Sequence, residues 1–391
     1  MVSETVVSET VVSERKSAAG AARIRVGVVG ANPSRGWGTA AHLPALRALE
    51  EFEIAAVATT RPESARASAE AFGAPLAFSD AADLVSHPDV DVVTIAVKVP
   101  EHERLIRAAL GSGKHVFSEW PLGVSASQAA ALAALAQASG VVHLVGLQGW
   151  HAPGALFVRE LIDQGAIGRP VAVSVVTAGG PAGARVAADH LYATDVAAGA
   201  TVLSISTGHV LATLASAVGR PRSLSAVIAS VNREATVIET GETVKVTAPD
   251  QVVLAGQLDN DAAFSVAVQG GAAPSGPGFE LRIVGTDATL TVRPASPGSI
   301  HITDWSVSIA RADGSADNLA VPDRLVTVPA SVPGGPPRNV AILYQLLAQA
   351  IHTGHPVAPS FNDAVDHHRL LDAIQQASDA GTARTTAYEV A

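Results

Sequence analysis

The chain has 391 residues, of which 48% are hydrophobic and 16% charged, so it can bury the cores of two or three domains. A formal net charge of −10, without a block of lysine or arginine, argues against direct nucleic-acid binding. The chain contains no cysteine, which excludes disulfides and thiolate chemistry and is typical of a cytoplasmic protein. No apolar run reaches the roughly 18 residues that a membrane helix requires.

The first residues repeat the unit VSETV over positions 2–14. This segment lacks the basic start and the long apolar centre of a signal peptide. We therefore predict a disordered tail over residues 1–22. A short β-arm that pairs with a partner subunit is the alternative interpretation.

Short apolar segments rich in valine and isoleucine alternate with helical segments between residues 23 and 150. The expected strands are 23–30, 53–60, 89–97, 115–119 and 142–148, and the expected helices are 38–50, 63–72, 80–86, 101–113 and 125–140. This alternation predicts a parallel, right-handed βαβ sheet, so we assign residues 23–150 to a Rossmann domain. Ligands of such sheets bind at the carboxyl ends of the strands.

The pattern changes after residue 150, where strands follow one another with few helices between them. We expect a helix at 153–164, a strand at 169–178, a helical stretch at 201–218, strands near 223–232, 251–258, 262–269, 279–284, 288–293 and 300–309, and helices at 338–353 and 361–380. Residues 251–269 are typical of a hairpin around Asn260 and Asp261. Residues 151–391 therefore predict an α+β domain with a large, mainly antiparallel, open-faced sheet. Its terminal helices could pack back on the Rossmann domain.

The first predicted strand ends in GANPSRGWG, residues 30–38, directly before a helix. A strand, a glycine turn and a helix amino terminus together form a pyrophosphate site, because backbone N–H groups and the helix dipole receive the charge. The motif departs from G-x-G-x-x-G: after Gly30, Asn32 occupies the second glycine position and Gly36 follows a longer loop. A plain tight turn is the alternative.

The second predicted strand ends in Thr59, Thr60 and Arg61. An NAD site usually has an acidic residue there, which binds the ribose 2′-hydroxyl. Two hydroxyls and a guanidinium instead suit a 2′-phosphate. We therefore favour NADP(H) over NAD(H). The alternative is that Arg61 is a solvated residue in the first turn of a helix.

Several later segments also lie at strand ends. They are AVKVPEH (96–102), GKHVFSEWPLG (113–123), GLQGWHAP (146–153), GATVLSISTGHVLATL (199–214) and AIHTGHPVAPSFNDAVDHHRLLDAIQQAS (350–378). In this order and spacing, the chain from residue 23 to about 381 resembles the glucose–fructose oxidoreductase / inositol dehydrogenase / MocA (Gfo/Idh/MocA) family. GANPSRGWG, EWPLG and GLQG are similar to the branch that contains the fungal galactose-pathway repressor, a regulator that keeps the dehydrogenase fold.

The resemblance implies a Rossmann domain that binds the cofactor and a second domain whose open sheet builds homodimers or homotetramers. The implied cofactor-binding residues are Gly30, Asn32, Gly36, Trp37, Thr59, Thr60, Arg61, Val97, His102, Glu119, Trp120, Pro121 and Gln148, with Pro121 expected in the cis form. Trp120 stands where the family has the lysine of Glu-Lys-Pro. Aligned on His209, Ile205 stands where the family has an aspartate, and Thr207 where it has a glycine. Both departures bring ordinary family chemistry into question.

Hydride transfer from or to a hydroxyl carbon needs a group that handles the hydroxyl proton. Trp120 cannot do so, because its indole only donates a hydrogen bond. We expect Lys98 to be catalytic, since a partly buried lysine at the cofactor edge would have a lowered pKa; a structural cation is the alternative. His209 is the second catalytic candidate, and a core histidine is its alternative.

The expected substrate-binding residues are Trp120, Trp150, His151, Tyr192 and Asp195. We expect no metal site, since neither His352 with His355 nor His367 with His368 has a convincing third ligand. Together these features predict an NADP(H)-dependent oxidoreductase that acts on a sugar or a cyclic polyol. The alternative is a catalytically silent dinucleotide sensor that controls a protein partner.

Overall fold

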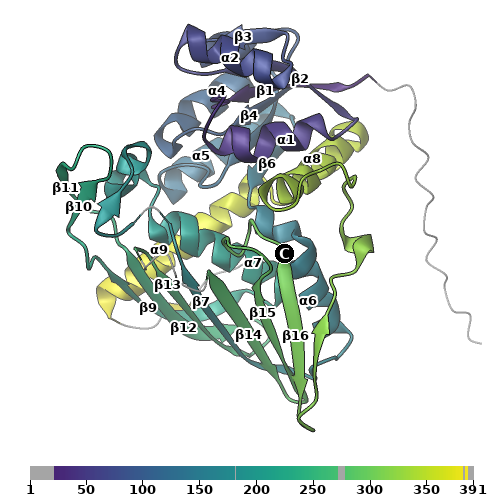
Figure 1. The fold of residues 1–391 in the computed structure, drawn as a ribbon, viewed down its shortest axis with the longest axis vertical. Helices are drawn as coiled ribbons and strands as arrows, with labels where there is room; N and C mark the ends of the chain where they lie inside the picture. The colour runs from purple at the N-terminus through teal and green to yellow at the C-terminus, as the bar shows by residue number, and fades with distance from the viewer. Residues whose placement is uncertain (1–21, 181, 272–277, 382–383, 386–391) are drawn as a thin grey trace, which may run out of the picture.

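A computed structural model describes residues 22–180, 182–271, 278–381 and 384–385 of the protein. Residues 1–21 of the predicted tail lie outside the described residues, so neither interpretation of the VSETV repeat is tested. The described chain forms a parallel sheet with its helices, a larger sheet, and a small third sheet (Figure 1). No helix among these residues is long and apolar enough to cross a membrane.

The first sheet has six parallel strands in the order β3-β2-β1-β4-β5-β6. They are β1 (Ile24–Val29), β2 (Phe52–Ala58), β3 (Leu76–Phe78), β4 (Val92–Ile95), β5 (His115–Glu119) and β6 (His143–Gly146). The central strands are rich in valine and buried on both faces, as a sheet covered by helices requires. The predicted Rossmann sheet is therefore confirmed. The sequence analysis missed β3, which has only three residues and no buried side chain.

The helices of this part are η1 (Gly38–His42), α1 (Leu43–Arg47), α2 (Pro62–Phe72), α3 (Ala81–Ser86), η2 (Val99–Glu101), α4 (His102–Gly111), α5 (Ala126–Ser139) and η3 (Gln148–His151). The predicted serine cap of α5 is present, because the side chain of Ser125 accepts a hydrogen bond from the N–H of Gln128. The helix expected over 38–50 is shorter than predicted: it begins as one π-helical turn and ends at Arg47.

The second sheet has nine strands in the order β17-β16-β15-β14-β7-β13-β12-β9-β18. They are β7 (Pro170–Ala178), β9 (Pro221–Ala229), β12 (Gln251–Leu258), β13 (Ala263–Gln269), β14 (Phe279–Gly285), β15 (Ala288–Pro294), β16 (Trp305–Arg311), β17 (Ala316–Leu319) and β18 (Arg384–Thr385). All neighbours are antiparallel except β7 and β13. The predicted hairpin is confirmed, and Asp261 in its turn has a positive φ of 66°.

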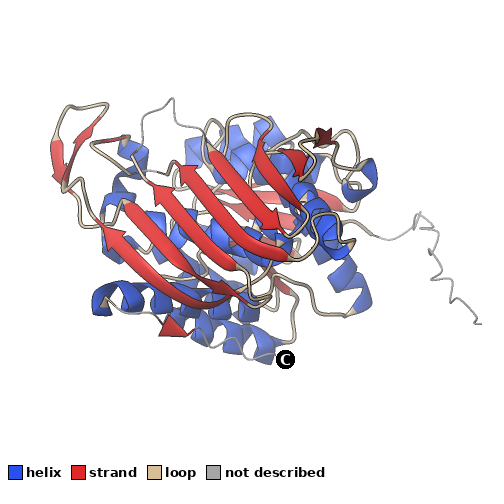
Figure 2. Cartoon of the chain, turned by 90° about the horizontal axis from the view of Figure 1, so that it is seen from below, coloured by secondary structure: helices blue, strands red, loops and turns tan. Residues whose placement is uncertain are grey.

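One face of the large sheet is covered by helices and the opposite face is bare (Figure 2). The remaining helices are α6 (Pro153–Asp163), η6 (Val202–Thr207), α7 (Gly208–Ala217), η7 (Asp323–Leu325), α8 (Pro336–Thr353) and α9 (Phe361–Ala380). On the bare face, Val176, Ala267, Val253 and Val227 stand side by side in one row across β7, β13, β12 and β9. Their side chains alternate with those that fill the core.

The two terminal helices contact the Rossmann part of the chain. Helix α8 packs on η1 and α1, and its Tyr344 lies in one hydrophobic cluster with Val26 and Phe52. Helix α9 packs on α5 and on β9. The division of the chain near residue 150 falls within η3 and stays a prediction.

A third, small sheet consists of β8 (Arg185–Val186), β10 (Glu234–Val237) and β11 (Thr243–Lys245), and sequence analysis missed it. Val186, Ala235 and Val237 form a hydrophobic cluster of their own. The short helices η4 (Ala188–Thr194) and η5 (Val196–Ala198) follow β8 in the chain. In Figure 1, β10 and β11 lie at the left edge of the molecule, away from the core of the large sheet.

Candidate dinucleotide and substrate site

A cavity of about 610 Å³ lies at the carboxyl ends of β1, β2 and β4, where the strand order reverses. It is lined by Val29, Gly30, Asn32, Ala58, Thr59, Thr60, Ser79, Asp80, Ala81, Ala96, Val97, Lys98, Glu101, Arg104 and Leu105. This is the place at which open α/β sheets bind nucleotides. The cavity brings together six of the predicted site residues: Gly30, Asn32, Thr59, Thr60, Val97 and Lys98.

The glycine loop is built for close approach of two backbones. Gly30 has a φ of 97°, and a Cβ there would lie 2.2 Å from the carbonyl oxygen of Ala96. A Cβ on Gly38 would lie 2.8 Å from the carbonyl oxygen of Gly30, so Gly38 allows η1 to pack against the strand end. Sequence analysis missed Gly38, although the second glycine of GWG signals it. Gly36 has a φ of 90° and open space beside it, and Trp37 precedes η1.

The end of β2 presents hydroxyls to the cavity and a guanidinium beside it. The Oγ1 of Thr59 lies 2.7 Å from the Oγ of Ser64 and donates to the carbonyl of Arg61, while Thr60 and Arg61 are exposed. Arg61 does not itself line the cavity. Three charged residues that sequence analysis missed do so: Glu101, Arg104, and Asp80, whose carboxylate caps α3 by accepting from the N–H of Ala82 at 2.9 Å.

Lys98 and Tyr192 meet at the rim of the cavity. The Lys98 ammonium lies 4.8 Å from the centre of the Tyr192 ring, a cation–π distance. Lys98 is exposed, so the partial burial expected of it is wrong in this structure. Burial raises the pKa of the Tyr192 hydroxyl. Arg35 of the glycine loop forms an ion pair with Asp189, so η4 contacts the Rossmann part twice.

Glu119 lies inside a chain of buried polar side chains. The Nε2 atom of His42 is 2.9 Å from the Glu119 carboxylate, and the Gln148 amide donates to it at 2.8 Å. On the other side of the imidazole, Nδ1 of His42 is 2.9 Å from the Tyr344 hydroxyl, which is 2.8 Å from Oγ1 of Thr94. These contacts engage its carboxylate within the protein, and direct binding of the cofactor by Glu119 stays a prediction.

Trp120 is buried rather than displayed as a wall of the cavity. Only 4% of the residue is exposed, and its indole N–H donates to the carbonyl of Ser204 at 2.8 Å. The rings of His367 and His368 pack on the indole at centroid distances of 4.9 and 4.6 Å. Helix α9 covers the indole in this structure, and a role of Trp120 in binding cofactor or substrate stays a prediction.

The peptide bond between Trp120 and Pro121 is cis, as expected from the resemblance. His102 holds this turn. One ring nitrogen is 2.9 Å from the carbonyl oxygen of Pro121 and the other is 3.0 Å from that of Val97. Burial lowers the pKa of His102. Its nitrogens are thus engaged by the backbone, and neither faces the cavity as a cofactor ligand.

His209 belongs to a cluster of buried histidines. Its ring stacks on His301 at a centroid distance of 3.6 Å and an interplanar angle of 3°. Nδ1 of each ring has no hydrogen-bond partner among the described residues. Burial lowers the pKa of His209 well below its usual range, and that of His301 to about 3. A neutral His209 stacked in the interior could accept a proton only after the site rearranged.

The other predicted substrate residues are held apart from the cavity. His151 bonds to the carbonyl of Ala358 at 2.9 Å, and burial lowers its pKa. The carbonyl of Trp150 accepts from Ser216, and its ring lies 5.9 Å from the Arg220 guanidinium. Asp195 caps η5 through the N–H of Ala197. The structure therefore brings Tyr192 to Lys98 and does not bring these three residues to the cavity.

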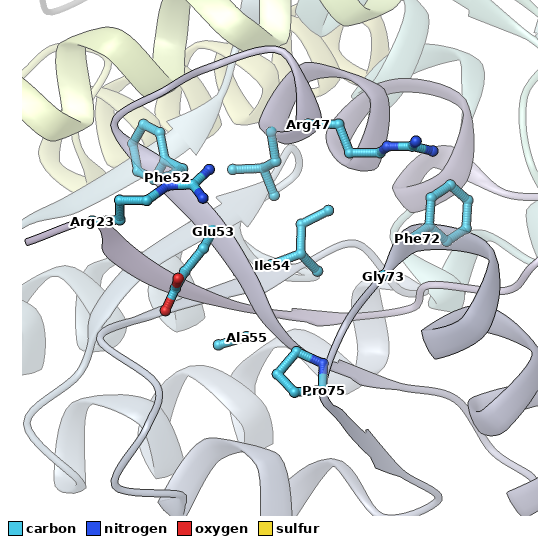
Figure 3. Close-up of a pocket in the computed structure, with 10 residues that line it drawn as sticks. Arg23, Arg47, Phe52, Glu53, Ile54, Ala55, Phe72, Gly73 and Pro75 are labelled. Carbon is cyan, nitrogen blue, oxygen red and sulfur yellow. The ribbon is translucent and has the colours of Figure 1, made fainter.

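A second cavity, of about 320 Å³, lies at the amino-terminal end of β2 (Figure 3). Its floor is formed by Phe52, Ile54 and Ala55, and the guanidinium groups of Arg23 and Arg47 stand at its rim. This is the edge of the sheet opposite the switch point, so it is not the dinucleotide cleft. No group of three or more metal-ligating side chains among the described residues could hold a metal ion.

Two family models match the chain in tandem. The oxidoreductase family with an NAD-binding Rossmann fold matches residues 24–147, and the Gal80p C-terminal domain matches residues 153–294. The fold and the cleft define a dinucleotide-binding protein of the Rossmann class. The Rossmann part, residues 24–147, thus matches the Gfo/Idh/MocA oxidoreductase family, and residues 153–294 match the Gal80p C-terminal domain.

Curated relatives include both enzymes and a regulator. The dehydrogenase aclE of Aspergillus oryzae is 34% identical over 52% of this chain and 57% of its own length. The galactose/lactose metabolism regulatory protein GAL80 of Saccharomyces cerevisiae is 30% identical over 49% of this chain and 46% of its own length. The chain thus spans about half the length of the curated relatives it matches.

Solved structures share the fold over nearly the whole chain. A super-repressor mutant of Saccharomyces cerevisiae Gal80p has a TM-score of 0.79 at 23% identity, covering 94% of this chain and 100% of that one. Levoglucosan dehydrogenase in complex with NADH and levoglucosan has a TM-score of 0.78 at 22% identity, with the same coverage. At these identities the likeness establishes the fold.

The buried histidines predict that the protein loses stability in mild acid. Burial lowers the pKa of His367 to about 4 and that of His368 to about 3, whereas an unfolded histidine titrates near 6.5. Below about pH 6.5 the unfolded chain binds more protons, so this stability is complete above that pH and lost as the pH falls towards 4. Each such histidine should lower the free energy of unfolding by up to about 1.4 kcal/mol per pH unit.

Urea unfolding at pH 7, 6 and 5 measures this slope. His368→Leu should make the fall of the unfolding free energy with pH shallower by the contribution of one histidine. The substitution removes a side chain that binds a proton in the unfolded chain but not in the folded protein. The control is His355→Gln, at an exposed position. Equal slopes in the wild type and in His368→Leu would contradict the prediction.

Proposed function

We propose that the protein is an NADP(H)-dependent oxidoreductase that acts on a CH–OH group of a sugar or a cyclic polyol. The observation that carries this proposal is the cavity of about 610 Å³ at the switch point of the sheet, with Lys98 at its rim. The match of residues 24–147 to an oxidoreductase family supports it. The relatives of the chain also include levoglucosan dehydrogenase and D-apiose dehydrogenase. A cytoplasmic location stays a prediction from the sequence.

A bound nicotinamide cofactor supplies the hydride chemistry, and the protein has to orient the substrate and move one proton. In the direction of carbonyl reduction, the Lys98 ammonium can donate that proton to the oxygen that becomes the hydroxyl. Its exposed position over Tyr192 leaves its N–H groups free to reach a substrate. His209 is the second candidate, but its stacking on His301 in the interior makes Lys98 the better one.

Replacing Lys98 with methionine should lower kcat by about 10²- to 10⁴-fold, because a positioned proton donor contributes that much. The assay follows the absorbance of reduced nicotinamide with a panel of sugars and polyols. Lys245→Met is the matched control, since Lys245 is exposed on β11, away from the cavity. An equal loss of kcat in His209→Ala, with Lys98→Met unaffected, would assign the role of proton donor to His209 instead.

The preference for NADP(H) rests on the end of β2. Thr59 and Thr60 line the cavity, and the exposed Arg61 directly precedes α2, with no carboxylate in these three positions. A guanidinium there can bind a 2′-phosphate through two parallel hydrogen bonds. Asp80 lines the cavity from the end of β3 and is engaged in capping α3.

Arg61→Ser should raise the Kd for NADPH by about 10- to 100-fold and leave the Kd for NADH unchanged, because it removes a charge-assisted contact with the 2′-phosphate alone. The control is Arg66→Ser, a charge removal at an exposed position farther along α2. Fluorescence titration with both reduced dinucleotides measures the two constants. Tighter binding of NADH than of NADPH by the wild type would refute the preference.

The second candidate function is that of a catalytically silent dinucleotide sensor that controls a protein partner. The burial of Trp120 favours it, since Trp120 occupies the position of the family lysine and cannot exchange a proton. Ile205, at the position of the family aspartate, cannot exchange a proton either. Dinucleotide binding without turnover of any compound in the panel, unchanged by Lys98→Met, would support the sensor over the enzyme.

We also propose that the bare face of the large sheet forms a homodimer or a homotetramer. Val176, Val253 and Val227 are 40%, 50% and 61% exposed and lie in one cross-strand row, in which Ala267 stands between Val176 and Val253. A contiguous apolar patch of this kind marks an interaction surface. A second copy of the same sheet is the occupant that the family resemblance suggests.

Val253→Lys should shift the protein towards the monomer by at least about 100-fold in dissociation constant, because an unpaired ammonium would be buried at the centre of the interface. Light scattering coupled to size-exclusion chromatography over a range of protein concentrations measures the shift. Val231→Lys places the same charge at an exposed position outside the strands and should have no effect. A monomeric wild type would contradict the proposal.

A further inference from the structure

Glu119 is a carboxylate that the fold holds at the carboxyl end of β5 with only N–H groups around it. Both contacts of its oxygens come from nitrogen atoms, Nε2 of His42 and Nε2 of Gln148. An ionised carboxylate can only accept hydrogen bonds, so this environment suits the charged form. A Cβ on Gly146 would lie 2.5 Å from the carboxylate, so the glycine makes room for it.

The hydrogen-bond chain on the far side of His42 fits a neutral imidazole. If Thr94 donates to the oxygen of Tyr344 and Tyr344 donates to Nδ1 of His42, then Nε2 carries the proton that is donated to Glu119. Every contact of the chain is then satisfied without a positive charge. Among the described residues, His42 is the one basic side chain that pairs with Glu119.

Trp120, the residue next to Glu119 in the chain, has no positive charge to balance the carboxylate. At the position where the family has a lysine, the indole of Trp120 is buried and donates to a backbone carbonyl. The nearest predicted site cation, Lys98, lies over the ring of Tyr192 instead. With a single proton on the ring of His42, no cationic side chain among the described residues pairs with the Glu119 carboxylate.

Glu119 also borders the cofactor edge of the sheet. Strand β5 is next to β4, whose end provides Val97 and Lys98 to the cavity. The side chain of Glu119 retains 12% exposure, so the polar chain is not fully sealed. On a sheet of this topology the glycine loop of β1 receives the pyrophosphate and the end of β2 the adenosine ribose, which leaves the ends of β4 and β5 for the nicotinamide.

We propose that Glu119 sets the preference of the protein for the oxidised over the reduced cofactor. The oxidised nicotinamide ring carries a positive charge and the reduced ring is neutral, so a nearby anion in a poorly solvated site stabilises the oxidised form selectively. This proposal rests on the proposed dinucleotide binding. It applies equally to a catalyst, on which the equilibrium between bound species would shift towards the oxidised cofactor and the reduced substrate, and to a sensor of redox state.

The test is the ratio of two dissociation constants, that of the oxidised cofactor divided by that of the reduced one. Calorimetric titration of the full chain with NADP⁺ and NADPH, and with NAD⁺ and NADH, measures it. Glu119→Gln keeps the shape of the side chain and removes the charge, so the ratio should rise about tenfold for the couple that binds. A loss of packing alone would weaken both forms equally and leave the ratio unchanged, which would overturn the proposal.

Two further variants separate the local charge from general electrostatics. Asp80→Asn removes an equal charge from the lining of the cavity, just after β3, and should leave the ratio unchanged, whatever it does to each affinity. His42→Gln should also leave the ratio unchanged, since an imidazole that holds one ring proton has no charge to lose. A shift in the ratio with Asp80→Asn as large as with Glu119→Gln, or a marked fall in the ratio with His42→Gln, would overturn the proposal.

The wild type alone provides a second test if Glu119→Gln fails to fold, as judged by circular dichroism. It should bind the oxidised form at least as tightly as the reduced form. Tenfold tighter binding of the reduced form would contradict the role of Glu119. If neither couple binds the wild type, it is the dinucleotide-binding function itself that fails, which distinguishes the two failures.

Discussion

The buried hydrogen-bond chain from Thr94 through Tyr344 and His42 to Glu119 holds the cofactor edge of the protein together. It joins β4, helix α8, the turn after the glycine loop and the end of β5, which come from four distant parts of the sequence. A buried polar group without a partner costs about 1–3 kcal/mol, so each member depends on the others. Helix α8 thus belongs to the architecture of the dinucleotide cleft, although it lies some 300 residues after the glycine loop.

Trp120 stands where the family has a lysine, and this difference changes the chemistry of the carboxyl end of β5. The indole occupies interior space against His367 and His368, and helices α7 and α9 close over it. A charged, exchangeable group is replaced by apolar packing and one hydrogen bond to the backbone. Acid–base chemistry, if the protein performs it, has to come from a different strand end. Lys98 is the side chain that the structure places at the cavity rim.

Much of the architecture was predictable because local sequence patterns dictate it. Runs of valine between helical segments predict buried parallel strands, and the succession of strands after residue 150, with few helices between them, predicts a mainly antiparallel sheet. The strands that escaped prediction were β3, β8, β10, β11, β17 and β18, each of two to four residues. Segments this short carry too few residues to display a period, and pairing with a neighbour is what makes them strands.

The same distinction between local sequence pattern and tertiary contact applies to the candidate site. The sequence by itself determined the glycine loop, the hydroxyl-rich end of β2, the position of Lys98 and the loss of the family lysine, because each of these depends on residue type at a strand end. Tertiary structure alone decided that Tyr192 lies beneath Lys98, that Glu119 is enclosed by His42 and Gln148, and that Trp120 is covered by α9. The reason is physical: whether a side chain is available to a ligand depends on what packs against it, and those partners come from distant parts of the chain.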